Sequence, residues 1–202
     1  MTPNIYLDLD KTLFNSQLFW QDTIISINKI NNTQLKADEL EIKYSSYYKD
    51  GSHYLDFSRL IKDSNINLNY LKQEIKALNN GYLLKDADFL LNWLDTNGYK
   101  TEIITIGDQN HQNLKIYFCG RLQKYKVSII NCEKNKYIKH FIGKKGILID
   151  DKPNQQLPVG WLEFYIDRNA VGEGFPKKIS NNVWVFNNLQ QIPRILQTTY
   201  SV

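Results

Sequence analysis

The sequence predicts an α/β fold in which a parallel sheet is covered by helices on both faces. Short apolar runs recur along the chain, helix-length segments separate several of them, and two of the runs end in acidic residues. Short apolar runs are typical of strands that are buried on both faces, as in parallel sheets. Strands that alternate with helical patterns indicate a sheet between helical layers. Right-handed crossovers then bring the carboxyl ends of the strands to one edge, where such sheets bind ligands.

The order of the elements predicts a large insertion after the first strand. That strand covers residues 5–9, and the later strands are expected at residues 101–106, 127–131, 146–149, 162–166 and 183–186. Between the first two strands, apolar residues at helical spacing predict helices after Ser16, over 55–62 and over 68–78. A further helix over 86–96 ends at Asn97-Gly98 and leads back to the sheet. We therefore expect a core of residues 1–15 and 83–202 and a helical insertion of residues 16–82.

Composition and charge exclude several classes of protein. Of the 202 residues, 42% are hydrophobic and 13% aromatic, which is too many for a disordered chain. The net charge of +4 is too small for a dedicated nucleic-acid binder, so nucleic acid is not an expected partner. The two cysteines provide neither a disulfide framework nor a zinc ribbon. Neither a signal peptide nor a membrane span is evident, so we expect a cytoplasmic protein that is a monomer or homodimer.

Two pairs of acidic residues follow predicted strands. Asp8 and Asp10 are two residues apart, which in extended chain places both carboxylates on one side. Asp150 and Asp151 directly follow another apolar strand. Carboxylates at a strand end can simply belong to a turn, but two such pairs on neighbouring parallel strands would concentrate negative charge at one edge. Hard oxygen ligands of this kind suit Mg²⁺, which is the predicted cofactor.

A hydroxyl group and a lysine complete the candidate site. Thr105 lies at the end of a predicted strand and is followed by Ile106 and Gly107, whose backbone could contact a phosphate. Lys134 and Lys136 follow the strand at 127–131, and either could neutralise a phosphoryl group. In a lysine-rich chain, each could equally be a solvated residue at the start of a helix.

In this order, these segments resemble the haloacid dehalogenase (HAD) superfamily of hydrolases. The resemblance rests on residues 8–14 (Asp-Leu-Asp-Lys-Thr-Leu-Phe), a strand ending in Thr105, a lysine, and Asp150-Asp151, and extends from Ile5 to about Leu196. A Gln-x-x-Lys stretch, Gln112 to Lys115, is also similar. The resemblance implies a three-layer Rossmann-like core with a small helical cap, formed here by residues 16–82.

Carried over by position, the resemblance implies a role for each residue. Asp8 is the nucleophile that becomes an aspartyl phosphate, and Asp10 is the acid and base whose carbonyl also binds Mg²⁺. Asp151 binds the metal directly, with Asp150 beside it or acting through water. Thr105, with Ile106 and Gly107, binds the phosphate. Lys134 is preferred to Lys136 as the site cation.

The expected activity is Mg²⁺-dependent hydrolysis of a small phosphomonoester, such as a nucleotide or a sugar phosphate. The alternatives are a phosphotransferase or mutase of the same fold and a non-catalytic binding protein that kept the fold. Nucleic-acid end processing has little support from the charge. The presence of Asp10 and of the second acidic pair favours a phosphatase over a dehalogenase. Substrate specificity is sought in the insertion, at Trp20, Tyr44, Tyr47, Tyr48, His53 and Tyr54, although aromatic residues at helical spacing are more often part of a core.

Overall fold

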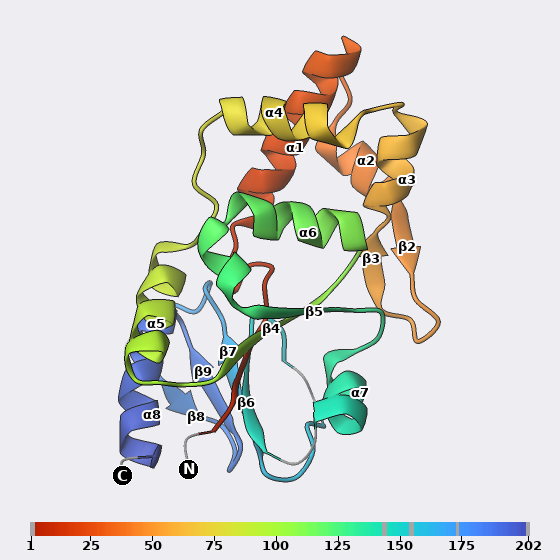
Figure 1. Cartoon of the computed structure of the whole chain (residues 1–202). Helices are drawn as coiled ribbons and strands as arrows, with labels where there is room; N and C mark the ends of the chain where they lie inside the picture. The colour runs from red at the N-terminus through yellow and green to blue at the C-terminus, as the bar shows by residue number, and fades with distance from the viewer. Residues whose placement is uncertain (1–2, 143–144, 154–155, 173, 201–202) are drawn as a thin grey trace.

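The computed structural model describes residues 3–142, 145–153, 156–172 and 174–200. Within these ranges the main sheet has seven strands in the order β5-β4-β1-β6-β7-β9-β8 (Figure 1). All neighbouring strands run parallel except β8 and β9. The six parallel strands confirm the predicted α/β fold. They are β1 (Ile5–Leu7), β4 (Thr101–Ile106), β5 (Lys126–Ile130), β6 (Gly146–Asp150), β7 (Trp161–Ile166) and β9 (Val183–Phe186), and the short β8 is Lys177–Lys178.

Helices cover both faces of the sheet, as expected for strands that are apolar on both sides. One face packs against α5 (Lys85–Thr96), α6 (Gln109–Phe118) and α8 (Ile192–Tyr200), and the other against α7 (Lys134–Tyr137) and the π-helical turn η2 (Ile138–Ile142). Along β1, Ile5 and Leu7 belong to the first hydrophobic cluster, whereas Tyr6 belongs to the second. Alternate residues of a strand point to opposite faces, so three β1 residues join both layers to the sheet.

The second cluster depends on a glycine. The ring of Tyr6 lies 5.0 Å from that of Trp161, and both cover the backbone of Gly146 at the start of β6. A Cβ at position 146 would lie 2.8 Å from the ring of Tyr6 and 2.9 Å from that of Trp161. A side chain here would therefore push the aromatic pair off the sheet beneath it.

Residues 16–82, which lie between β1 and α5, form a separate group of elements above the sheet (Figure 1). Three helices were expected here, and they correspond to α1 (Ser16–Asn31), α3 (Phe57–Asp63) and α4 (Leu68–Ala77); the structure has a further short helix, α2 (Ala37–Lys43), that was not predicted. The structure adds a hairpin of β2 (Ser45–Tyr47) and β3 (His53–Leu55). The predicted helix start near residue 55 is wrong, because β3 occupies those residues and Asp56 caps α3 by accepting from the Arg59 amide.

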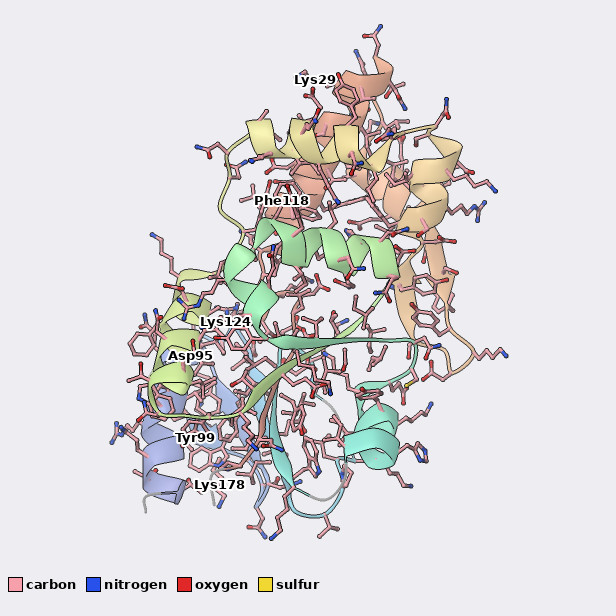
Figure 2. The ribbon with its side chains drawn as sticks, in the orientation of Figure 1. Lys29, Asp95, Tyr99, Phe118, Lys124 and Lys178 are labelled. Carbon is pink, nitrogen blue, oxygen red and sulfur yellow. The ribbon has the colours of Figure 1, made fainter. Side chains whose placement is uncertain are left out.

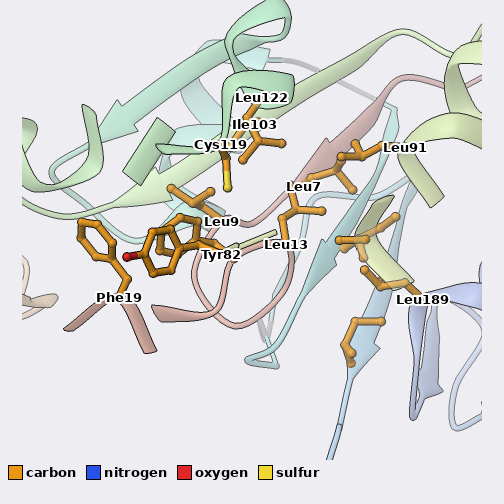
Figure 3. Close-up of a cluster of buried hydrophobic side chains, with 14 of the residues drawn as sticks. Leu7, Leu9, Leu13, Phe19, Tyr82, Leu91, Ile103, Cys119, Leu122 and Leu189 are labelled. Carbon is orange, nitrogen blue, oxygen red and sulfur yellow. The ribbon is translucent and has the colours of Figure 1, made fainter. Parts of the chain in front are cut away.

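The chain leaves the core and returns to it at one place. The amide of Asn15 donates to the carbonyl of Tyr82, and the amide of Leu84 donates to that of Leu13. Beside this crossing, the side chain of Phe14 packs on Phe19 and Tyr82, with ring centroids 5.3 and 5.6 Å away. Figure 3 shows Phe19 and Tyr82 next to the core leucines. The hydrophobic cluster is therefore continuous from the sheet into the insertion.

Ion pairs on the surface of the core connect neighbouring helices away from this crossing. The side chains of Asp95 on α5 and Lys124, in the 3-10 helix η1 (Gly120–Lys124), approach to 2.5 Å, and both are labelled in Figure 2. Such exposed pairs contribute little, about 1 kcal/mol or less. None of the helices in the described residues is long and apolar enough to cross a membrane.

A buried histidine lies where the insertion meets α6. The ring of His111 stacks on Phe57 of α3 at 4.7 Å and lies near Trp20 of α1. Its Nε2 has no hydrogen-bond partner among the described residues. Burial, together with the nearby charge of Lys115, lowers the pKa of His111 well below its usual value. The imidazole is therefore held neutral in the folded protein.

We expect this histidine to make the protein less stable in mild acid. Between the lowered pKa of the folded state and the ordinary value of about 6.5, His111 takes up a proton only on unfolding. The free energy of unfolding should then fall by up to about 1.4 kcal/mol per pH unit below pH 6.5. Urea unfolding of wild type and His111→Phe between pH 5 and 7.5 measures this. The free energy of unfolding of wild type, relative to that of the variant, should decrease as the pH falls. Parallel pH profiles would contradict the assignment.

Candidate active site

The acidic residues predicted from the sequence meet at the carboxyl ends of β1 and β6. These two strands are parallel neighbours, with Leu7 aligned with Ile149, and the Asp8 amide donates to the Ile149 carbonyl. Oxygen atoms of Asp8, Asp150 and Asp151 lie within 4.8 Å of one another. Asp8 and Asp150 are 4% and 1% exposed. The topology therefore brings together carboxylates that are more than 140 positions apart in the sequence.

The electrostatics of this cluster suit a cation. Burial raises the pKa of Asp8 well above its usual value, and Asp150 adds to the increase. Burial and Asp150 also raise the pKa of Asp151. Ionised carboxylates this close are unfavourable unless positive charge lies between them. Three oxygen donors of this kind fit Mg²⁺, so the residues present match the cofactor expected from the sequence.

Lys134 supplies a positive charge at the same place. Its Nζ lies 2.5 Å from Asp8 Oδ1 and 2.6 Å from Asp150 Oδ2. Burial opposes the charged form, but the two carboxylates raise the pKa of Lys134 above its usual value. Lys136 is about half-exposed, and its Nζ lies 3.5 Å from Asp50 and 3.4 Å from Glu133. The structure thus places Lys134, and not Lys136, beside Asp8.

Asp10 has a different set of partners from Asp8, although both line one cavity. Lys115 Nζ lies 2.5 Å from Asp10 Oδ1, Ser16 donates to the same oxygen, and Gln112 donates to Oδ2 at 3.0 Å. Burial opposes ionisation, but Lys115 and the other donors lower the pKa of Asp10 below its usual value. The Gln-x-x-Lys spacing in the sequence does not by itself assign a role to Gln112 or Lys115. Their spacing of three residues places both on one face of α6, which was the available signal.

Thr105 contributes a hydroxyl group that lacks a partner. It is fully buried at the end of β4, and its Oγ1 has no hydrogen-bond partner among the described residues. Thr105 and Ile106 line the same cavity as Asp8 and Lys134. Buried polar groups normally form hydrogen bonds, so an unpartnered donor facing a cavity indicates a position for a bound ligand oxygen.

The loop after Thr105 is held by Gln112. Its Nε2 donates to the Ile106 carbonyl at 2.9 Å as well as to Asp10. A Cβ at Gly107 would lie 2.4 Å from that same nitrogen, so only glycine leaves room for the amide. Gln112 therefore connects the predicted phosphate loop to the predicted acid and base.

The cavity that contains these groups has a volume of about 600 Å³. Its wall includes Lys11 and Lys152 from the core and Ser52 and His53 from the hairpin. Of the six residues considered for specificity, His53 lines the cavity as the structure describes it. The others lie elsewhere: Trp20 and Tyr44 are buried in the hydrophobic core, Tyr47 is exposed, and Tyr48 and Tyr54 stack on each other.

Comparison with known proteins shows similarity in structure. No protein-family model matches the sequence, and no curated protein matches it. A HAD phosphatase from Thermococcus onnurineus is 18% identical, with a TM-score of 0.59 over 96% of this chain and 97% of its own. A magnesium-bound HAD hydrolase from Bacillus subtilis is 12% identical, with a TM-score of 0.57 over 96% and 98%. A 2-haloacid dehalogenase from Pseudomonas syringae is also 12% identical, with a TM-score of 0.58 over 98% and 100%. The chain therefore has the fold of the HAD-superfamily hydrolases.

Proposed function

We propose that the protein is a Mg²⁺-dependent phosphatase that hydrolyses a small phosphomonoester through an aspartyl phosphate on Asp8. The observation that carries this proposal is one cavity that holds a buried carboxylate, a buried lysine and an unpartnered hydroxyl. These are Asp8, Lys134 and Thr105. Phosphoryl transfer requires mainly positioning and neutralisation of charge, and these groups supply both.

The reaction takes place in two displacements. A carboxylate oxygen of Asp8 attacks phosphorus, the bond from phosphorus to the leaving oxygen breaks, and Asp10 gives a proton to that oxygen. Asp10 then takes a proton from water, which attacks phosphorus and releases phosphate and the free Asp8 carboxylate. Each displacement has a lower barrier than direct hydrolysis. The donors around Asp10 favour its ionised form, which the second step requires, and the proton that it then takes from water restores the protonated form that the first step of the next turnover requires.

Thr105 and Lys134 hold the transferring phosphoryl group. The Thr105 hydroxyl donates to one of its oxygens, with the loop of Ile106 and Gly107 beside it, and Lys134 neutralises its charge. Asp8, Asp150, Asp151 and the backbone carbonyl of Asp10 would hold Mg²⁺. When bound, the metal offsets the negative charge that the carboxylates and the phosphate bring together.

We also propose that residues 16–82 act as a cap on a core formed by residues 1–15 and 83–202. Ser52 and His53 bring the insertion to the cavity that Asp8 lines. The wall there is polar and charged, which suits the hydroxyl-rich leaving group of a sugar phosphate or of a nucleotide. A lid in this position would exclude water from the reacting phosphoryl group.

Removal of metal is expected to abolish activity. With a generic aryl phosphate, we expect release of inorganic phosphate in the presence of Mg²⁺ and at least about a hundredfold less in EDTA, because the carboxylates and the phosphate then repel each other. Colorimetric phosphate release measures this, with excess Mg²⁺ added back as the control. Full turnover in EDTA would contradict the metal dependence. Absence of turnover on a broad panel of phosphomonoesters by the folded protein would favour a binding protein.

A further inference from the structure

The hairpin of the insertion contacts the core at two points that flank the cavity. In Figure 1 the strands β2 and β3 extend from the helices of the insertion towards the side of the core where α7 lies. The hydroxyl of Tyr48 donates to the Gly107 carbonyl at 2.8 Å. Two residues later, Asp50 Oδ2 accepts from the Glu133 amide at 2.7 Å. Both contacts join a hairpin side chain to the core backbone.

These two points belong to the segments that present the phosphate-binding side chains. Gly107 is in the loop that directly follows Thr105 and Ile106. Glu133 directly precedes Lys134, the first residue of α7. A helix of four residues has little stability of its own, so the position of its start depends on contacts from outside. One hairpin therefore contacts both the loop beside Thr105 and the start of the helix that carries Lys134.

The tip of the hairpin is built to hold this geometry. The Tyr48 ring stacks on Tyr54 at 4.1 Å with an angle of 13° between the planes. Asp50 Oδ1 accepts from the Ser52 amide, and the Tyr48 amide donates to the Ser52 carbonyl. Gly51, with φ of +88°, lies between them in a conformation that favours glycine. Contacts within the hairpin therefore orient the side chains of Tyr48 and Asp50 towards the core.

Contact with the cavity distinguishes these residues from their neighbours. Ser52 and His53 line the cavity, whereas Tyr48 and Asp50 reach the core outside its lining. Ser52 and His53 can therefore touch the leaving group of a substrate, while Tyr48 and Asp50 contact the core backbone, and Asp50 also lies 3.5 Å from the half-exposed Lys136 Nζ.

We propose that Tyr48 and Asp50 are positioning residues through which the hairpin sets the geometry of the phosphate-binding segments. The proposal rests on the proposed function, because it assigns Thr105 and Lys134 to the phosphoryl group. Neither Tyr48 nor Asp50 lines the cavity. Loss of either side chain should therefore lower kcat/KM by the same factor for every phosphomonoester. Binding of inorganic phosphate, which has no leaving group, should be weakened as well.

The experiment compares Tyr48→Phe and Asp50→Ala with Ser52→Ala and His53→Ala. We expect Tyr48→Phe to lower kcat/KM about 3- to 10-fold, as for one neutral hydrogen bond, and Asp50→Ala by about tenfold. The factor should be equal for an aryl phosphate, a sugar phosphate and a nucleoside monophosphate, and inhibition by inorganic phosphate should weaken similarly. Ser52→Ala and His53→Ala should instead change the order of preference among the substrates. Tyr54→Phe, which keeps the stacked ring and the Tyr48 bond, is the control and should match wild type.

A second measurement separates this inference from the proposed function. Amide hydrogen exchange at Glu133 should accelerate about tenfold in Asp50→Ala and stay unchanged in Tyr54→Phe, whether or not the protein turns over substrate. Factors that vary with the leaving group, or unchanged phosphate binding and amide exchange in both variants, would overturn the proposal. A wild type that binds phosphate but hydrolyses no ester would overturn the function alone. A wild type that does neither would overturn both.

Discussion

Replacement of Asp8 by Asn is expected to lower the turnover of phosphomonoesters at least about a thousandfold while leaving the protein folded. An amide oxygen is a poor nucleophile, and the side chain has nearly the same shape as the carboxylate. Burial raises the pKa of Asp8 against the opposing effect of Lys134, and repulsion from Asp150 adds to the increase, while Lys134 keeps Asp150 as a second partner at 2.6 Å. A neutral residue relieves that repulsion, although it weakens the contact with Lys134. We therefore expect the melting temperature to remain close to that of wild type.

Phosphate release and thermal unfolding, measured on the same preparation, test this expectation. Asp22→Asn is a suitable control because Asp22 is another buried carboxylate, which accepts from Tyr82 and Asn80 inside the insertion. This variant should keep its activity at temperatures where it is folded. Turnover by Asp8→Asn within tenfold of wild type would exclude Asp8 as the nucleophile.

Replacement of Lys134 by Met is expected to affect activity and stability together. Without the ammonium group, Asp8 and Asp150 remain buried next to each other with no cation between them. Loss of one partner from a buried ion pair typically costs about 3 to 5 kcal/mol of unfolding free energy. We expect a destabilisation of this order without divalent cations, and turnover at least about a hundredfold lower. Because Mg²⁺ can replace part of the missing charge, it should stabilise the variant more than it stabilises wild type.

Urea unfolding with and without Mg²⁺, together with phosphate release, checks these outcomes. Lys136→Met removes a cation two residues away that is about half-exposed, and it should lose less than about 1 kcal/mol. Activity retained in Lys134→Met but lost in Lys136→Met would reverse the assignment of the site lysine. If Mg²⁺ raised the free energy of unfolding equally in wild type and Lys134→Met, Lys134 would not share the charge balance of the carboxylate cluster.

Local sequence signals were sufficient for the sheet and for the residues at its edge. Apolar runs marked the parallel strands, because burial on both faces leaves few polar residues in them. The same runs placed Asp8, Thr105 and Asp150 at strand ends, and the parallel topology brought them to one cavity. Their roles in catalysis stay predictions that the variants above test.

Other features depended on contacts that the sequence does not reveal. The hairpin has only three residues in each strand, too few to show alternation, and its Asp50-Gly51 turn resembles the start of a helix. The residues alone left Lys134 and Lys136 open, because the choice depends on which face of a short helix meets the sheet, and only the family resemblance preferred Lys134. The link from Lys115 to Asp10 crosses 105 positions and exists only after α6 packs beside the strand ends.

The single crossing between core and insertion has a consequence for how such a protein can diversify. Leu13 and Asn15 are hydrogen-bonded to Leu84 and Tyr82, so the two ends of the 67-residue segment between positions 15 and 83 lie side by side and are joined by backbone hydrogen bonds. A change of length within the segment therefore leaves the backbone hydrogen bonds at its two ends in place. Evolution could therefore exchange this segment as one unit, provided that the replacement kept contacts equivalent to those of Tyr48 and Asp50 with the backbone of Gly107 and Glu133.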